Sequence, residues 1–240
     1  MAGGLSPLDL PEQRPTRVEI SLDAVDANLA AVRARVGNLP ILGVVKANGY
    51  GHGAVPVARA LAGAGIDSLA VALLEEAKEL RRGGITVPLL MMGALEPGQM
   101  DAVIREGVTP ALFREDQITA LDLSASRSGR PHPFHLKVDT GMGRLGIPWN
   151  RVDNILDLIA RCPRLLMDGV FSHLACADDP DHPLTQVQMD RFEEVLGKIR
   201  SRGLSPRYRH LSNSAALLDR PPTWMNLVRP GLLLYGYRPS

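Results

Sequence analysis

The sequence predicts an α/β protein built as a TIM-type (β/α)8 barrel, and three observations carry this prediction. Eight short apolar runs recur along the 240 residues, and most are followed by a turn signal and a helical pattern, which indicates repeated βα units and a parallel sheet. The runs are apolar at consecutive positions, as expected for strands buried on both faces. Polar and glycine residues cluster directly after the runs, where a barrel builds its active site. A doubly wound open sheet is the competing interpretation, but no glycine fingerprint for a dinucleotide follows the first run.

The expected strands are bounded by glycine, proline or small polar residues. In chain order they are Ile41–Val45, Ser68–Leu73, Pro88–Met92, Val108–Phe113, Phe134–Val138, Met167–Ser172, Tyr208–Leu211 and Leu232–Tyr235. Helical periodicity predicts helices that include Leu22–Val36, Ala54–Ala64 and Glu75–Arg82. Ser21 is the expected N-cap of the first of these helices.

The two ends of the chain depart from a regular barrel. Residues 1–16 are predicted to be a flexible leader, and Arg17–Ile20 is predicted to be an extra strand before the barrel. The eighth strand is expected to finish at about Tyr235, close to the end of the sequence. Because a helix normally follows each barrel strand, we expect residues 17–240 to form a barrel whose last strand lacks its covering helix.

Composition argues against several classes of protein. Lys and Arg number 27 and Asp and Glu number 26, so the net charge of +1 gives no support to a nucleic-acid or anionic-membrane partner. No apolar run approaches the ~20 residues of a membrane-spanning helix, and the N-terminus has neither the basic start nor the apolar stretch of a secretory signal. The only cysteines, Cys162 and Cys176, cannot form a disulfide framework and suit a reducing compartment, so a cytoplasmic location is expected.

The first candidate for chemistry is VVKANGYGHG, residues 44–53, at the end of the first expected strand. Its lysine, Lys46, follows apolar neighbours, and a desolvated amine is a nucleophile toward aldehydes. The glycines beyond it allow the backbone to approach a ligand closely. A surface lysine before a glycine-rich turn is the alternative for Lys46 taken alone. The segment lacks the phosphate-loop pattern GxxxxGK[ST].

A second segment, FHLKVDTGMGRLG at residues 134–146, places polar side chains along a strand. Strand alternation points His135, Lys137 and Asp139 toward one face. A polar face inside a barrel is costly unless its groups pair or bind something. These residues therefore either form a simple Lys137–Asp139 ion pair or hold a ligand.

A third segment, FSHLACAD at residues 171–178, ends the sixth expected strand. His173, Cys176 and Asp178, with His182 nearby, have the side chains of metal ligands, but their spacing fits no standard zinc pattern. A neutral imidazole that stacks on a planar ligand fits the segment better. No metal is therefore expected.

The last two segments are HLSNSAA at residues 210–216 and VRPGL at residues 228–232. Small polar residues at a strand-to-helix turn place hydroxyl and N–H groups where an anion can bind, although an ordinary N-cap by Ser212 or Asn213 also explains them. Arg229 brings a fixed positive charge beside Gly231. Taken together, a lysine, histidines, an arginine and an anion cradle after different strands meet the needs of a pyridoxal phosphate site.

These segments, in this order and at these intervals, resemble the barrel domain of bacterial alanine racemases. The resemblance runs from about Pro15 to Tyr237, and its first two segments are the most specific. It implies a fold-type III enzyme that uses pyridoxal 5′-phosphate to interconvert L- and D-alanine for cell-wall synthesis. It also implies a homodimer for the complete family member.

The resemblance further implies a role for each matching residue that would hold the cofactor. Lys46 would bind it as a Schiff base and act as acid and base on one face of the substrate. Tyr50 and Ser214 would bind the phosphate, and the backbone amides of Gly231 and Leu232 would contribute.

Five other residues would surround the ring and the substrate. His173 would stack against the pyridine ring, Arg229 would bond its nitrogen, and His210 would support Arg229. Arg144 would contact the O3′ side and orient the other catalytic group, and Lys137 matches a position that is carbamylated in several members. Because an arginine keeps its proton, the ring nitrogen should stay unprotonated, which favours racemisation over transamination.

The C-terminus departs from the family pattern. Members carry a β-rich domain after the barrel, and a tyrosine of that domain, supplied by the partner subunit, is the second catalytic base. None of the tyrosines of this sequence sits in the matching motif. We therefore expect a barrel that binds the cofactor but lacks the second base and racemises alanine weakly or not at all.

Two other functions remain open. A standalone pyridoxal phosphate carrier or homeostasis protein is a single barrel of this length, although Lys137, Arg144 and HLSNSAA resemble the racemase instead. A broad-specificity amino-acid racemase would share these segments. A decarboxylase is expected to differ around the substrate.

Overall fold

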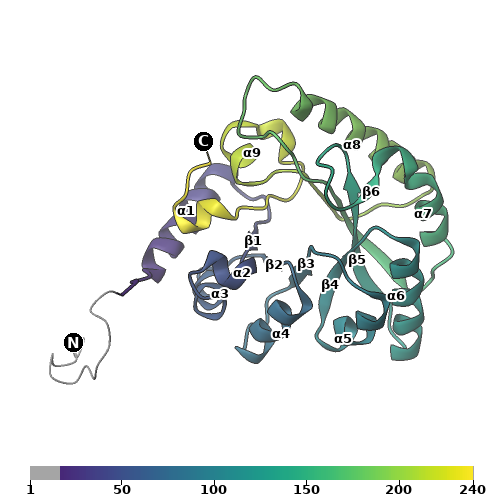
Figure 1. Cartoon of the computed structure of the whole chain (residues 1–240), viewed down its shortest axis with the longest axis horizontal. Helices are drawn as coiled ribbons and strands as arrows, with labels where there is room; N and C mark the ends of the chain where they lie inside the picture. Colours follow the sequence, from purple (N-terminus) through teal and green to yellow (C-terminus); the bar gives the residue numbers. More distant parts are fainter. Residues whose placement is uncertain (1–16, 240) are drawn as a thin grey trace.

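The computed structural model describes residues 17–239, and seven of the eight expected strands form close to their predicted positions. The strands are β1 (Leu42–Val44), β2 (Ser68–Val71), β3 (Leu89–Met91), β4 (Val108–Leu112), β5 (His132–Asp139), β7 (Leu165–Phe171) and β8 (Tyr208–His210). Neighbours in the chain pair in parallel, and the short β6 (Ile147–Pro148) pairs with β5 off this path. The strands curl into a ring with helices outside it, which confirms the predicted α/β barrel (Figure 1).

Helices cover the outer face of the ring (Figure 1). The α-helices are α1 (Leu22–Val36), α3 (Ala54–Gly63), α4 (Leu74–Arg82), α5 (Met100–Arg105), α6 (Glu115–Ser128), α7 (Val152–Ile159), α8 (Leu184–Ser201) and α9 (Ser214–Asp219), and the short element α2 (Lys46–Tyr50) is a left-handed turn. Short 3-10 helices are η2 (Pro97–Gln99), η3 (Trp149–Arg151), η4 (Pro221–Thr223) and η5 (Leu232–Tyr235). The prediction of Ser21 as an N-cap is confirmed, because its hydroxyl accepts a hydrogen bond from Ala24 N at 3.2 Å.

The predicted eighth strand is wrong, since Leu232–Tyr235 forms the 3-10 helix η5. The segment just before it closes the ring: Leu42 N donates to Val228 O and Val44 N to Pro230 O, both at 2.9 Å. On its other side Arg229 N donates to Ser212 O at 3.2 Å. Pro230 has no N–H to continue such a ladder, so the extended segment ends there and the chain turns into η5.

The sequence did not predict which helix covers the closing segment of the barrel. Helix α1, which precedes β1, packs against η5 and α3, and it buries Val25 and Leu29. Asn28 Nδ2 donates to Leu234 O at 3.1 Å, which joins the two ends of the described chain. Figure 1 shows α1 beside the yellow C-terminal segment. The helix that closes the outer layer therefore comes from the start of the chain.

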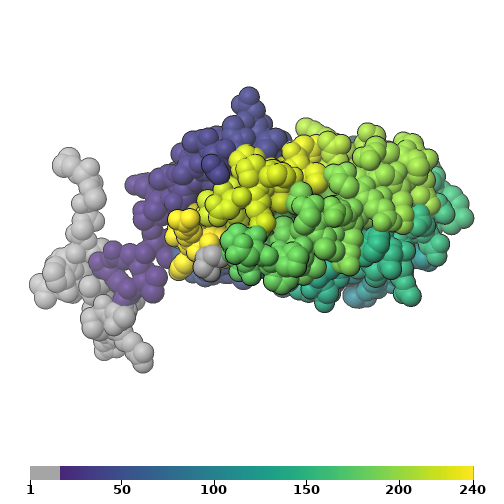
Figure 2. Space-filling view, turned by 90° about the horizontal axis from the view of Figure 1, so that it is seen from above, coloured from purple at the N-terminus to yellow at the C-terminus, as the bar shows by residue number. Residues whose placement is uncertain are grey.

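Residues 17–20 do not form the predicted extra strand. Their backbone pairs with no neighbouring strand of the described chain, and Val18 is 86% exposed. Figure 2 shows this purple segment standing away from the body of the molecule. An apolar alternation without an adjacent strand cannot form a ladder, which explains the error. The leader predicted at residues 1–16 lies outside the described residues.

The core has two parts. Most buried apolar side chains lie between the ring and its helices, and they include Ile41 and Val45 of the first apolar run. The alternate positions Leu42 and Val44 belong to a small cluster inside the ring. The other members of that inner cluster are Ala70, Leu90 and Leu227. The rest of the interior is polar, and this polar part leads to the candidate site.

Within residues 17–239, no helix combines the length and the apolar character needed to cross a membrane.

Candidate active site

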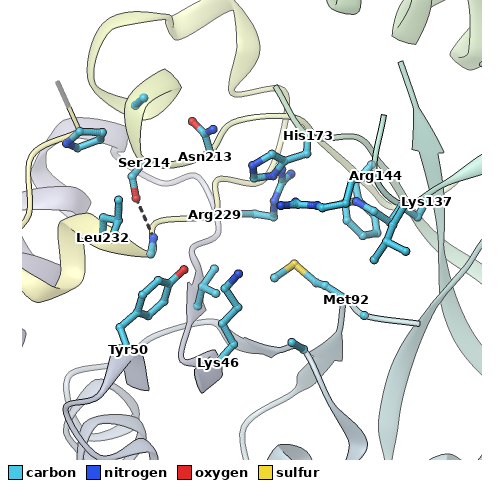
Figure 3. Close-up of a pocket in the computed structure, with 18 of the residues that line it drawn as sticks. Lys46, Tyr50, Met92, Lys137, Arg144, His173, Asn213, Ser214, Arg229 and Leu232 are labelled. Atoms are coloured by element: carbon cyan, nitrogen blue, oxygen red, sulfur yellow. Dashed lines mark hydrogen bonds between the residues drawn. The ribbon is translucent and has the colours of Figure 1, made fainter. Parts of the chain in front are cut away.

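A cavity of about 680 Å³ opens at the carboxyl ends of the strands, where the polar segments of the sequence meet (Figure 3). Almost all predicted site residues line it: Lys46, Tyr50, Lys137, Arg144, His173, Ser214, Arg229, Gly231 and Leu232. His210, the remaining one, is fully buried directly behind Arg229. The cationic side chains Lys46, Lys137, Arg144 and Arg229 share this lining with the carboxylate of Asp178. The cavity is therefore suited to an anionic ligand.

Lys46 is followed by a left-handed turn of the backbone. The φ angles of Ala47, Asn48, Gly49 and Tyr50 are 53°, 55°, 60° and 53°. L-residues lose roughly 1–2 kcal/mol each in this conformation, so the surrounding contacts must hold it. The Asn48 side chain accepts from Ala54 N at 2.8 Å, and Gly51 N donates to Ala47 O at 3.0 Å.

Glu76 anchors the same turn from the neighbouring βα unit. Its Oε1 accepts from Ala47 N at 2.6 Å, and its Oε2 accepts from Ala72 N at 2.8 Å and from Leu73 N at 3.0 Å. One carboxylate thus ties the start of the turn to the end of β2. The effect is to place Lys46 at the cavity rather than on the outer surface, and Figure 3 shows its amine pointing into the cavity.

One end of the cavity gathers hydroxyl and amide groups. Ser214 Oγ accepts from Gly231 N at 2.9 Å and from Leu233 N at 3.4 Å. A Cβ atom on residue 231 would lie 2.8 Å from Tyr50 Oη, so only glycine lets the tyrosine hydroxyl approach so closely. Burial raises the pKa of Tyr50, which keeps this hydroxyl protonated and able to donate. In Figure 3, Tyr50, Ser214 and Leu232 lie together on one side.

Arg229 forms the centre of the cavity floor. Its Nη2 donates to Ser172 O at 2.8 Å and to Leu211 O at 2.9 Å, and its Nη1 donates to His210 Nδ1 at 3.0 Å. The guanidinium is buried, and burial lowers the pKa of Arg229 to about 9. The group therefore stays charged at neutral pH, held by carbonyls and an imidazole.

Lys137 and His173 are both shifted toward their neutral forms. Burial, helped by the charges of Arg229 and Arg144, lowers the pKa of Lys137 to about 7. Its Nζ lies 4.4 Å from the ring centroid of Phe171, whereas the Asp139 carboxylate accepts from Gly141 N at 2.9 Å. Asp139 thus orders the loop that leads to Arg144, and the simple Lys137–Asp139 ion pair is not what the geometry favours.

His173 lies across the cavity beside Arg229 (Figure 3). Burial, with the charge of Arg229 as the next cause, lowers the pKa of His173 to about 3. Its imidazole is therefore neutral over the physiological range, as the sequence predicted. Its backbone is held by α8, because Gln188 Nε2 donates to His173 O at 2.8 Å.

Several residues of the site were not singled out by the sequence. Met92, Gly93 and Phe171 line the cavity, and Glu76 shapes it from behind. Met92 and Gly93 follow β3 as Lys46 follows β1, so their place at the end of a strand was the available signal. Glu76 carried no such signal, because its partners are backbone amides. Within residues 17–239, no group of three or more His, Cys, Asp or Glu side chains is arranged to hold a metal ion.

The sequence of the chain is similar to those of known alanine racemases. The family model described as "Alanine racemase, N-terminal domain" matches residues 20–239. The alanine racemase of Symbiobacterium thermophilum is 44% identical over 234 residues, which cover 97% of this chain and 62% of the relative. That of Desulforamulus reducens is 43% identical over 231 residues, covering 95% of this chain and 62% of the relative. The chain thus spans about three fifths of the length of these relatives.

The fold of the chain is also similar to solved structures of alanine racemases. Alanine racemase from Streptomyces lavendulae has a TM-score of 0.88 and 39% identity, over 95% of this chain and 61% of that one. Alanine racemase from Bacillus anthracis, solved with bound L-Ala-P, has a TM-score of 0.89 and 34% identity, over 96% of this chain and 60% of that one.

Proposed function

Because this chain belongs to the alanine racemase family, we propose that it is the pyridoxal-phosphate-binding barrel of an isomerase that interconverts L- and D-alanine. The single observation that carries the proposal is the cavity that brings Lys46, Arg229 and the Tyr50–Ser214–Gly231 group together. These residues come from three separate segments of the sequence, residues 44–53, 210–216 and 228–232. Their convergence provides an amine, a donor for a ring nitrogen and a cradle for a phosphate in one place.

The residues present fit pyridoxal phosphate. Tyr50 Oη, Ser214 Oγ and the Gly231 N–H would bind the phosphate. Tyr50 Oη lies close to the backbone of Gly231, so these three groups would surround the phosphate at one end of the cavity. The Lys46 amine would hold the aldehyde end, and the neutral His173 imidazole would stack on the ring. When bound, the cofactor supplies the electron-withdrawing ring that lets an amino acid lose its Cα proton.

Arg229 would decide what happens to that proton. With a pKa of about 9 it donates a hydrogen bond at neutral pH without giving up its proton. It would therefore hold the ring nitrogen without protonating it, which limits how much charge the ring accepts. Return of the proton to Cα is favoured over transamination, as racemisation requires.

Interconversion of the two enantiomers needs a proton removed on one face of Cα and returned on the other. We propose that Lys46 serves one face. Tyr50 Oη lies close to Gly231, at the end of the cavity proposed for the phosphate, so we do not propose Tyr50 as the second base. For the whole protein we propose a homodimer in which a tyrosine of the partner subunit is the second base, as the sequence resemblance implies.

The substrate we propose is alanine. The related Bacillus anthracis structure carries L-Ala-P, and that of Clostridium difficile alanine racemase is a complex with cycloserine. We further propose that the D-alanine serves peptidoglycan precursor synthesis in the cytoplasm. Free thiols at Cys162 and Cys176 suit that reducing compartment.

The experiment is cofactor binding by the purified chain. Added pyridoxal phosphate should give the absorption band of a lysine-bound cofactor, and Lys46→Ala should remove that band. Lys78→Ala, on α4 outside the cavity lining, is the matched control and should leave it unchanged. An identical band in the Lys46→Ala protein would overturn the assignment of the cofactor lysine.

A further inference from the structure

Below Arg229 a column of polar side chains continues through the interior of the barrel, away from the cavity. His210 Nε2 lies 2.9 Å from His135 Nδ1, and both imidazoles are buried. His135 Nε2 in turn lies 3.9 Å from Asp168 Oδ2. Asp168 and His135 both line a second, smaller cavity of about 140 Å³. Residues of that cavity such as Ser68 and Tyr208 begin strands, which places it at the amino-terminal mouth of the barrel.

The donors and acceptors of this column can be arranged in one order, in which each N–H points away from Arg229. A guanidinium only donates, so Arg229 Nη1 donates to His210 Nδ1, which must be unprotonated. The single proton of a neutral His210 is then on Nε2, and it is donated to His135 Nδ1. The proton of His135 is left on Nε2, where it faces the Asp168 carboxylate. Every N–H in the column points from Arg229 toward Asp168.

Both histidines are neutral, as this order requires. Burial lowers the pKa of His135 and lowers that of His210 well below its ordinary value. The contact with His135 lowers the pKa of Asp168, so this carboxylate is charged at neutral pH. A charged His210 would have no lone pair for Arg229.

The backbone makes room for the column. The pairing of β5 with β7 shifts by one residue between Phe134 and His135, which sets His135 opposite Gly169. A Cβ atom on residue 169 would lie 2.5 Å from His135 Nδ1, so only glycine accommodates the imidazole there. Asp168 directly precedes this glycine. One short segment of β7 therefore supplies both the space for His135 and the carboxylate that faces it.

The column helps to compensate the buried positive charge of Arg229. Arg229 is a buried cation, and its hydrogen bonds go to two carbonyls and an imidazole instead of a carboxylate. A buried charge is costly without compensation. Asp168 supplies a negative charge 3.9 Å from His135 Nε2, and the hydrogen bonds from Arg229 through His210 to His135 polarise one another.

We propose that Asp168 and His135 are positioning residues that orient Arg229 and tune its hydrogen bond to the ring nitrogen of the cofactor. Neither residue touches the cavity that holds the cofactor. The charge of Asp168, 3.9 Å away, favours the Nε2–H form of His135, His135 accepts from the Nε2–H of His210, and His210 presents a lone pair to Arg229. The inference rests on the proposed function, because it concerns the same arginine.

The first test needs no cofactor. In the chain labelled with ¹⁵N-histidine, long-range ¹⁵N–¹H correlation spectra should show His135 and His210 neutral, each with its proton on Nε2. A proton on Nδ1 of either ring, or a charged ring at neutral pH, would overturn the proposed order. This result stands whether or not the chain binds pyridoxal phosphate.

The second test compares pyridoxal phosphate with its 1-deaza analogue, in which a carbon replaces the ring nitrogen, by equilibrium dialysis. The unaltered chain should bind the analogue at least about ten-fold more weakly, because the Arg229 donor loses a charged hydrogen bond. Asp168→Asn should weaken binding of pyridoxal phosphate about five-fold, or roughly 1 kcal/mol, and leave the analogue unchanged. In a His135→Leu background the Asp168→Asn change should have no further effect.

Asp67→Asn is the matched control, since Asp67 lines the same mouth but contacts Arg33 Nη2 at 2.6 Å and Ile41 N at 2.9 Å. It should leave both affinities unchanged. If Asp168→Asn weakens both ligands equally or neither of them, Asp168 does not act through Arg229 and the inference is overturned. If the unaltered chain binds both ligands equally well, the contact of Arg229 with the ring nitrogen is wrong, which is a failure of the proposed function itself.

Discussion

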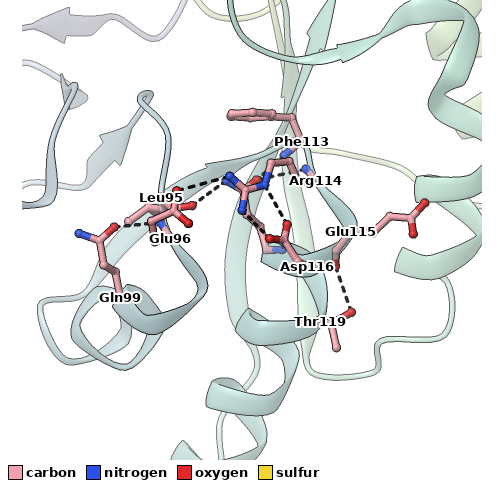
Figure 4. Close-up of polar contacts among 9 residues, drawn as sticks. Leu95, Glu96, Gln99, Phe113, Arg114, Glu115, Asp116 and Thr119 are labelled. Carbon is pink, nitrogen blue, oxygen red and sulfur yellow. Dashed lines mark hydrogen bonds and ion pairs between the residues drawn. The ribbon is translucent and has the colours of Figure 1, made fainter.

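Two arginines at the same rim of the barrel, Arg114 and Arg229, are used in opposite ways. Arg114 follows β4, and its guanidinium pairs with both carboxylate oxygens of Asp116 and with Glu96 Oε1 at 3.4 Å (Figure 4). These two carboxylates raise the pKa of Arg114. Arg229 lies inside the ring, where burial lowers its pKa to about 9.

The difference shows that one arginine of this fold joins structural elements, whereas the other is available to a ligand. Glu96 lies in the loop after β3 and Asp116 in the first turn of α6, so Arg114 joins two neighbouring βα units. Its guanidinium is paired with two carboxylates of the protein. Within residues 17–239 no carboxylate forms an ion pair with Arg229, and this arginine faces a cavity of about 680 Å³. A cation left without a paired anion is available to a ligand, whereas a paired cation fastens the scaffold.

The largest effect expected from this comparison is on cofactor binding. Arg229→Gln should weaken binding of pyridoxal phosphate about 10- to 100-fold, since a hydrogen bond from a charged donor contributes roughly 1.5–3 kcal/mol. Arg114→Gln removes the same charge at the same rim and should change the affinity less than about two-fold. Equilibrium dialysis of both variants measures the contrast. Equal losses in the two variants would show that the rim charge, and not the position of Arg229, attracts the ligand.

A smaller effect, a pH-dependent modification of the side chain, is expected at Lys137, the other strongly buried cation of the cavity. We propose that its amine forms a carbamate with CO₂, as the sequence resemblance implies, because only a neutral amine can react. With a pKa of about 7 the ammonium predominates below pH 7 and the neutral amine above it. The neutral fraction therefore rises from about one tenth at pH 6 to about nine tenths at pH 8.

Carbon-13 NMR with labelled CO₂, held at a constant dissolved concentration, should show a carbamate signal that grows over this range. The signal should be absent from Lys137→Gln. Lys198→Gln is the control, because Asp153 and Glu194 pair with Lys198 and raise its pKa. A signal that persists in Lys137→Gln, or that never appears at pH 8, would contradict the proposal.

The contrast between the two arginines also explains what the sequence could reveal. Most of the strands, and the polar segments that follow them, were predictable, because local apolar runs and turn residues specify them. Arg229 was found through its segment, which resembles a known family. The resemblance implied the contact of His210 with Arg229, but the continuation through His135 to Asp168 was not predicted, since His135 and His210 are 75 residues apart and meet only in the folded barrel.

The error at Leu232–Tyr235 has a related cause. Leu232–Tyr235 has the composition of a strand, yet Pro230 ends the ladder and the apolar side chains pack against α1 instead. Helix α1 comes before β1 in the sequence but covers the closing segment. Local pattern cannot show which distant element will cover a given run, because only tertiary packing decides it.

The smallest effect is expected at Arg114 itself, and it concerns stability. Exposed ion pairs contribute little, because solvent already screens the charges and two long side chains must be ordered. Arg114→Gln should therefore lower the melting temperature by at most about 3 °C. The difference from the unaltered chain should shrink further in 1 M salt, where charges interact over only about 3 Å. A large drop that persists in salt would mean that Arg114 acts through packing, and the distinction between a fastening cation and a ligand-binding cation would no longer rest on its ion pairs.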